Sequence, residues 1–313
     1  MVNTDKYENA SKILTDYISK NNISLTLNKK IEEAYNKFQS KYSPEVLKKL
    51  EGNELLNYLF LHDGNKENLA YALEFDNDYK YFGSTGVGTS YKYRLFKDKK
   101  TNHWVTGISK KNEEVLSLSG AIEKAIKIRD SLVNGGELIK NSSLNTPEDY
   151  ENLEKELTTI FKGCDLKPTF TWIHKYYHMI YPNKFPVIHS DNWRKYILNK
   201  FSIDSSSKSY YADGEIVKIA KLAKLDNYTF YKIFISKFGK LDHNNDSENL
   251  NNTQKIWILS PGEGAKLWDE FKQKNIITIG WGDLGDLNQY ESKDEIRKEL
   301  QKNILQIKNK LII

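Results

Sequence analysis

The chain has a single cysteine, Cys164, among 313 residues. One thiol cannot form an internal disulfide framework or a multi-cysteine metal cluster, so we expect neither. No stretch approaches the roughly 20 apolar residues that a membrane-spanning helix needs, and the first residues lack the apolar core of a signal peptide. These absences predict a cytoplasmic protein with no membrane partner.

Arginine is also scarce, because 43 of the 47 basic residues are lysine and only Arg94, Arg129, Arg194 and Arg297 are arginine. Heavy use of Lys, Asn and Ile is typical of an AT-rich genome, so the lysine count is weak evidence for nucleic-acid binding. The distribution of charge is more informative. Residues 151–241 carry 15 Lys or Arg against nine Asp or Glu, a surplus larger than the +5 of the whole chain.

A nucleotide-binding lysine is missing as well. Gly83 to Ser90 (GSTGVGTS) has two glycines at the spacing of a phosphate-binding loop, but no lysine follows them to reach the outer phosphates. The next residues, Tyr91 to Phe96, have the composition of a strand, whereas a phosphate-binding loop leads into a helix. We interpret the glycines as a flexible hairpin loop, and we expect no cofactor.

The length exceeds that of one typical domain. Residues 242–254 (DHNNDSENLNNTQ) are almost free of apolar side chains, which is typical of a linker. A softer boundary is expected near 141–147, after Gly135 and Gly136, which we interpret as a helix stop. The predicted organisation is an α+β domain at 1–140, a basic, aromatic-rich helical domain at 147–241, the linker, and a C-terminal unit at 255–313.

Periodicity predicts an α+β fold class, with a small antiparallel sheet in a mainly helical chain. Apolar stripes at helical spacing predict helices between Asp5 and about Phe60, from Ser119 to Val133, and again between 147 and 241. Strands are expected at 69–75, 91–96 and 104–108, the last two joined by a polar tip at 98–102.

The predicted hairpin from Tyr91 to Lys111 is a candidate nucleic-acid contact, because a basic β-ribbon can follow phosphates or enter a major groove. Only Asp98 opposes its basic residues before Glu113. The alternative is a solvated hairpin whose lysines protect a sheet edge. The expected backbone contacts in this hairpin are Lys92, Arg94, Lys97, Lys99 and Lys100.

A second candidate contact is Trp193, Arg194 and Lys195, in the aromatic-basic stretch 168–201. At a helix start these residues could combine stacking on a base with contact to a phosphate. Aromatic side chains in such a stretch are also typical of a protein core.

The histidines of this stretch do not predict chemistry. His174 and His178 lie four residues apart, but no glutamate stands between them to act as a base, so we expect no metal site. Glycines that would form a nucleophile elbow are absent around His189, Ser190 and Asp191. Ser190 or Asp191 instead suits the cap of a helix at 192–201. No catalytic residue is predicted.

Residues 256–290 have the order strand, turn, helix, strand, with tryptophans beside the turns. The segment resembles the opening half of the EVE-type, PUA-like domains found at the front of some McrB-type restriction proteins. The residues that carry the resemblance are Trp257, Ser260, Pro261, Gly262, Trp268, Ile279, Gly280, Trp281, Leu284, Gly285, Asp286 and Leu287.

Domains of this family, like the related YTH readers, are mixed β-barrels with an aromatic pocket for a modified or flipped base. The resemblance therefore implies a pocket formed by Trp257, Ser260, Trp281 and Asp286, with Trp268 in the core. A full domain has further strands after the helix expected at 292–310, so the resemblance implies a partial PUA-like barrel.

The resulting hypothesis is a DNA-binding specificity protein that recognises modified bases, by base flipping, for an McrB-type restriction or antiphage defence system. A GTPase motor and a nuclease subunit would then be its partners, with no catalytic activity in this chain. One alternative is a nuclease or glycosylase that acts on modified DNA. The others are a protein-interaction module and an RNA-binding EVE protein.

Overall fold

The computed structural model describes residues 4–25, 29–60, 65–86, 89–206, 209–241 and 267–274, together with 289, 295–296 and 298–299. The chain divides into two compact units, 1–243 and 244–313, and the division falls inside the range predicted as a linker. The predicted pocket residues Trp257, Ser260, Trp281 and Asp286 lie outside the described residues.

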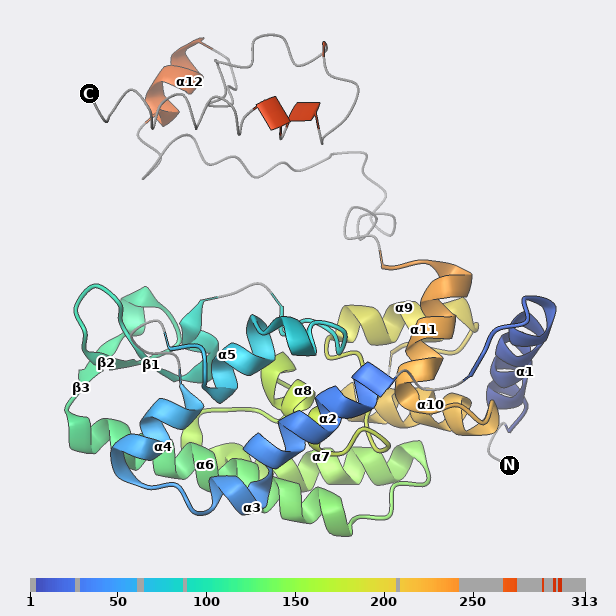
Figure 1. Cartoon of the computed structure of the whole chain (residues 1–313), viewed down its shortest axis with the longest axis horizontal. Coiled ribbons are helices and arrows are strands. Elements are labelled where there is room, and N and C mark those ends of the chain that lie inside the picture. Colours follow the sequence, from blue (N-terminus) through green and yellow to red (C-terminus); the bar gives the residue numbers. More distant parts are fainter. Residues whose placement is uncertain are drawn as a thin grey trace. The chain divides into compact units, whose positions relative to one another are not determined.

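Most described residues of the first unit are helical (Figure 1). Its helices are α1 (Thr4–Lys20), α2 (Lys29–Tyr42), α3 (Pro44–Leu47), α4 (Gly52–Leu59), α5 (Leu69–Glu74), α6 (Leu118–Asn141), α7 (Pro147–Phe161), α8 (Thr171–Ile180), α9 (Asp191–Lys200), α10 (Ser209–Leu222) and α11 (Asn227–Phe238). Short 3₁₀ helices lie at Asn77–Tyr79, Ser90–Tyr93, Lys110–Asn112 and Lys162–Cys164. Among the described helices, none is long and apolar enough to cross a membrane.

A small antiparallel sheet accompanies the helices, so the α+β class is confirmed at this coarser level. Its strands are β1 (Leu95–Lys97), β2 (Trp104–Thr106) and β3 (Glu114–Leu116), in the order β1-β2-β3. Val105 lies opposite Phe96 on one side and Val115 on the other. Helix α6 contacts all three strands. The predicted hairpin at 91–111 is therefore present around β1 and β2.

Two expected strands are corrected. Leu69–Glu74 form helix α5 in place of the strand expected at 69–75, because Asn68 caps the helix by accepting a hydrogen bond from the Tyr71 backbone N–H at 2.8 Å. A short apolar run does not distinguish a buried strand from a buried helix. The segment from Tyr91 is also helical at first, and β1 begins only after Arg94, whose φ of +61° turns the chain.

Helix α6 continues through Gly135 and Gly136, so the predicted helix stop is wrong. A Cβ atom at Gly135 would lie 2.1 Å from the Tyr177 hydroxyl, and one at Gly136 would lie 2.6 Å from Pro44 Cγ. The glycines thus serve close packing of α6 against α8 and α3 rather than termination.

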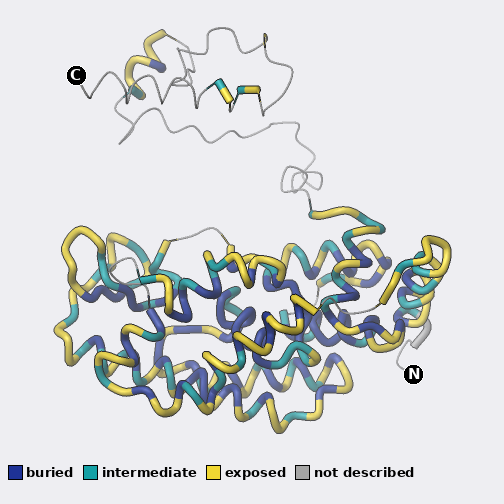
Figure 2. Tube along the Cα trace, in the orientation of Figure 1, coloured by how far each residue is buried: buried dark blue, intermediate teal, exposed yellow. Residues whose placement is uncertain are grey.

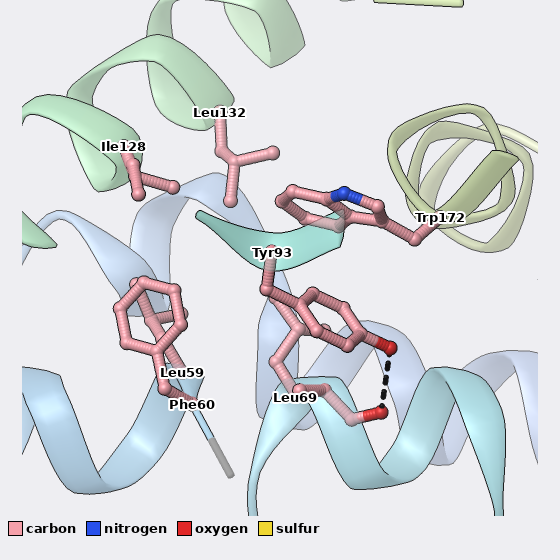
Figure 3. A pocket seen from close by; sticks show the side chains of 8 residues that line it. Leu59, Phe60, Leu69, Tyr93, Ile128, Leu132 and Trp172 are labelled. Atoms are coloured by element: carbon pink, nitrogen blue, oxygen red, sulfur yellow. Dashed lines mark hydrogen bonds between the residues drawn. The ribbon is translucent and has the colours of Figure 1, made fainter. Parts of the chain in front are cut away.

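Buried residues line the inner sides of the helices (Figure 2). The larger core cluster extends from α2 to α10, so residues from the ranges 1–140 and 147–241 share it. A smaller cluster joins α1, α9, α10 and α11. Packing is tight: a void of about 10 Å³ remains near Tyr93 and Trp172 (Figure 3), with room for about one water molecule.

In the second unit the described helix is α12 (Trp268–Lys274). Trp268 is 53% exposed, whereas Phe271 is buried, so the prediction that Trp268 belongs to the core is wrong. Phe271, on the same short helix, occupies the interior position instead. The strands expected for a partial PUA-like barrel fall outside the described residues.

Candidate functional site

Lys92 and Arg94 of the hairpin are bound to the protein itself. Lys92 Nζ lies 2.9 Å from Glu74 Oε1, and both side chains are largely buried, at 16% and 15% exposure. Arg94 donates from Nε to the Asp165 carbonyl at 3.1 Å, and its guanidinium lies over the Phe170 ring. Both side chains are thus engaged by the protein itself, and contact of either with a phosphate stays a prediction.

The tip of the hairpin presents the other predicted lysines. Lys99 and Lys100 are exposed, and no described residue forms an ion pair with either of them. Asp98 shapes the tip by accepting hydrogen bonds from the backbone N–H groups of Lys100 and Thr101, at 2.9 and 2.8 Å. Lys97, in β1, is half-buried. Lys99 and Lys100 thus place unpaired positive charge at the tip, and Lys111 is also exposed at the end of the hairpin.

Helix α9 places the three residues of the second predicted contact, Trp193, Arg194 and Lys195, in different environments. Ser190 caps the helix as predicted, since its side chain accepts from the Trp193 N–H. Trp193 is half-buried against Tyr231 of α11, with ring centroids 6.1 Å apart. Arg194 is buried, and Lys195 is exposed. Lys195 is thus the only member of the trio whose charge reaches the surface.

Helices α9 and α11 pack together through aromatic rings, including Tyr196 and Phe234 at 5.7 Å between centroids. Lysines occupy their solvent-facing positions, whereas α11 contains no acidic residue. Lys200 and Lys237 lie over tyrosine rings, contacts that leave their charge unneutralised. We refer to the following residues as the α9–α11 lysine set: Lys195, Lys200, Lys232, Lys237 and Lys240.

A row of hydrogen bonds, the buried histidine network, connects α8, α9 and α10. Arg194 donates to Asp213 from Nε at 2.7 Å and from Nη2 at 3.1 Å. Asp213 Oδ2 lies 2.7 Å from His174 Nε2, and His174 Nδ1 lies 2.8 Å from His189 Nδ1. His189 Nε2 ends the row, 2.7 Å from the Phe82 carbonyl oxygen.

Proton counting constrains the network. A carbonyl oxygen only accepts, so His189 Nε2 donates to Phe82. The three hydrogen bonds from Phe82 to Asp213 need three protons, and two neutral imidazoles supply two. The third proton is therefore shared between His174 and Asp213. Burial opposes ionisation of Asp213, but the charges of Arg194 and His174 outweigh it and lower the pKa of Asp213.

All four side chains of the network are almost fully buried. They join helices rather than face solvent, so the network offers no group to a substrate in this structure. Among the residues that the structure describes, no cluster of His, Cys, Asp and Glu could hold a metal ion. Asp213 has no local signal in the sequence, because its partners lie 19 and 39 residues away.

An open cleft of about 340 Å³ lies between α2, the turn after α8, and the start of α11. Its lining residues are Glu32, Tyr35, Asn36, Gln39, Pro182, Asn183, Asp226, Asn227 and Tyr228. Sequence reasoning missed this site. The spacing of Glu32, Asn36 and Gln39 along one side of α2 is its only local signal, since the other two walls come from distant segments.

Comparisons with known proteins add no relative: no family model, no curated protein and no solved structure matches the chain.

Proposed function

We propose that this chain is a DNA-binding specificity protein that recognises modified bases for an McrB-type restriction or antiphage system. The observation that carries the proposal is the positive charge left at the surface after internal pairing. Exposed lysines without a carboxylate partner among the described residues include Lys99 and Lys100 at the hairpin tip and members of the α9–α11 lysine set. Lysines without carboxylate partners suit contact with phosphates, which fixes a protein on a duplex without reading its sequence.

Recognition of the modification is assigned to the second unit on the resemblance alone. Trp257 and Trp281 would supply the aromatic faces that replace the stacking a flipped base loses, and Ser260 and Asp286 would bind its polar edge. Cleavage and the GTPase motor would belong to partner chains.

The first experiment measures affinity of the purified chain for matched duplexes that are unmodified or contain methylcytosine or methyladenine, across a salt series. We expect steep weakening with salt and tighter binding to one modified duplex. Trp281→Ala should remove that preference and leave the binding common to all duplexes. Absence of binding, or equal binding to every duplex, would overturn the reader function.

A second arm tests the lysines. Lys99→Ala combined with Lys100→Ala should flatten the plot of log affinity against log salt by about 0.9 for each phosphate that the variant no longer neutralises. The matched control is Lys48→Ala with Lys140→Ala, because these exposed lysines pair with Glu137 and Glu45. An equal effect of the control would show that total charge, rather than the hairpin tip, drives binding.

A third arm replaces the duplexes with single-stranded and double-stranded RNA of the same sequence. Lysine–phosphate contacts do not separate the two polymers, so a difference would come from contacts to the 2′-hydroxyls, from the shape of the helix or from the bases. Tighter binding to RNA than to every DNA duplex would favour the RNA-binding alternative.

A further inference from the structure

The cleft beside α2 is rich in hydrogen-bond acceptors, and the amides of Asn36 and Asn183 in its lining can both donate and accept. Its volume of about 340 Å³ lies within the range of small-molecule sites. Glu32 and Asp226 both line it, and no lysine or arginine lines it among the described residues. Each oxygen of Asp226 already accepts one hydrogen bond from Thr229, at 2.9 Å from the backbone N–H and 2.5 Å from the hydroxyl, so only its remaining lone pairs are open to a ligand. No described residue pairs with Glu32.

The acceptor character of Tyr35 follows from the tautomer of His178. His178 Nδ1 lies 2.8 Å from the Phe185 carbonyl oxygen, so Nδ1 carries the proton. Burial lowers the pKa of His178 to about 3, which keeps the ring neutral and leaves Nε2 as an acceptor. The Tyr35 hydroxyl, 2.8 Å away, must donate to it. Only the lone pairs of the Tyr35 oxygen then remain for a ligand.

The side-chain amides of Gln39 and Asn227 are also oriented so that their nitrogens donate to the protein. Gln39 Nε2 donates to the carbonyls of Met179 and Ile180, at 3.1 and 3.3 Å. Asn227 Nδ2 donates to the Pro182 carbonyl at 2.8 Å. The amide nitrogens therefore hold α2 and α11 to the end of α8 and the turn after it. The oxygens of both amides have no partner among the described residues.

An aromatic wall completes the cleft. Tyr228 is half-buried and packs on Phe82, with centroids 5.8 Å apart. Tyr81, which is 48% exposed, lies near enough to contribute to the raised pKa of Tyr228, after the larger contribution of burial. Lys80 Nζ lies over the Tyr81 ring. Tyr228 thus gives the cleft an aromatic ring for a flat ligand, whereas Tyr81 and Lys80 are not among its lining residues.

We propose that this cleft binds a nucleobase that carries an exocyclic amino group, such as cytosine or adenine. The amino group would donate to the Glu32 and Asp226 carboxylates, and the ring would lie against Tyr228. Uracil presents a carbonyl oxygen where cytosine presents its amino group, so these acceptors would repel it. The choice of a base as the ligand rests on the proposed function. The preference for a donor rests on the Glu32 carboxylate and on the orientations of Tyr35, Gln39 and Asn227.

The test is a ligand-observed NMR titration of the full chain with cytidine, adenosine and uridine. We expect cytidine or adenosine to bind about tenfold more tightly than uridine, as the loss of one hydrogen bond to a carboxylate would cause. Glu32→Gln should remove most of this difference. Glu33→Gln is the matched control, because Glu33 is exposed on the same helix turn and pairs with Lys29.

Equal binding of all three nucleosides, or an equal effect of the control, would overturn the assignment. Spermidine provides a separate check, since it has charged donors but no ring. Binding of spermidine that displaces cytidine at equal concentration would show an amine site rather than a base site. Glu32 is exposed and the change is isosteric, so loss of folding is not expected; thermal unfolding of both variants checks this.

The outcomes for the cleft and for the proposed function are separable. Duplex binding without nucleoside discrimination overturns the cleft assignment and leaves the specificity function standing. Nucleoside discrimination without duplex binding supports the cleft and removes the DNA function.

Discussion

Arg194 and Lys195 are neighbours in the sequence, but Arg194 is buried and Lys195 is exposed. The Arg194 side chain is 2% exposed and is bound by Asp213 through two hydrogen bonds, whereas Lys195 is exposed without a described ion-pair partner. Successive residues of a helix point about 100° apart, so a basic dipeptide can belong to the core and to the surface at once. In the core a charge needs a partner, while water solvates it at the surface.

The hairpin repeats this contrast. Lys92 pairs with Glu74 and Arg94 donates to the Asp165 carbonyl, whereas Lys99 and Lys100 remain exposed at the tip. A basic stretch therefore overstates the charge available to a ligand. Only the unpaired part is relevant to a polyanion.

The largest expected change in stability comes from comparing Asp213 and Asp191, two carboxylates that bind the same arginine. Asp213→Ala should lower the free energy of unfolding by about 3–5 kcal/mol, because it leaves Arg194 buried without its main partner. Asp191→Ala should cost less than about 1 kcal/mol, since Asp191 is 62% exposed. Urea unfolding followed by circular dichroism measures both. Similar losses would refute the distinction between buried and exposed partners.

A second test compares two glycines. Gly135→Ala should cost about 1–3 kcal/mol, because its Cβ would lie 2.1 Å from the Tyr177 hydroxyl in a packed core. Gly163→Ala is the control, as no atom lies within 4 Å of a Cβ there. Adding Tyr177→Phe to Gly135→Ala should recover part of the loss on thermal unfolding. No recovery would show that the hydroxyl is not the atom that clashes.

Acid should destabilise the protein through its buried histidines. Burial lowers the pKa of both His178 and His189, so the unfolded chain binds more protons than the folded one below about pH 6.5. The free energy of unfolding therefore has its full value, as far as these rings are concerned, above this pH. It falls by about 1.4 kcal/mol per pH unit for each ring as the pH drops toward 3.

Urea unfolding at several pH values measures this slope. His178→Asn retains an N–H group for the Phe185 carbonyl but does not titrate in this range, so its slope should be smaller by one proton. An unchanged slope in the variant would assign the acid sensitivity to other groups.

The smallest difference concerns the two kinds of hairpin lysine. Lys92→Ala should lower the free energy of unfolding by about 1–2 kcal/mol, because the largely buried Glu74 loses its ion pair and retains the hydrogen bond from the Tyr93 hydroxyl. Lys99→Ala should change it by less than about 0.5 kcal/mol. Thermal unfolding of both variants distinguishes them. A comparable loss in Lys99→Ala would place the tip in the folded core rather than at a binding surface.

Local patterns predicted many elements. The stripe of Ile31, Ala34, Tyr35 and Phe38 is buried along α2, as its helical spacing indicated. The cap at Ser190 and the hairpin around β1 and β2 are also confirmed. The pattern was misleading for α5. Most residues of this short helix are buried, so its apolar run shows no helical period that would distinguish it from a strand.

The sequence by itself determined the features that depend on near neighbours: amphipathic helices, caps, and a lysine-bearing hairpin with a polar tip. Only the tertiary structure decided which charges turn inward and where the cleft lies. Asp213 meets His174 across 39 residues, and the cleft combines walls from α2, residues 182–183 and the start of α11. Such pairings depend on which helices pack together. Packing is driven by the burial of apolar surface, which is not directional, so the residues near Asp213 in the sequence do not indicate its partners.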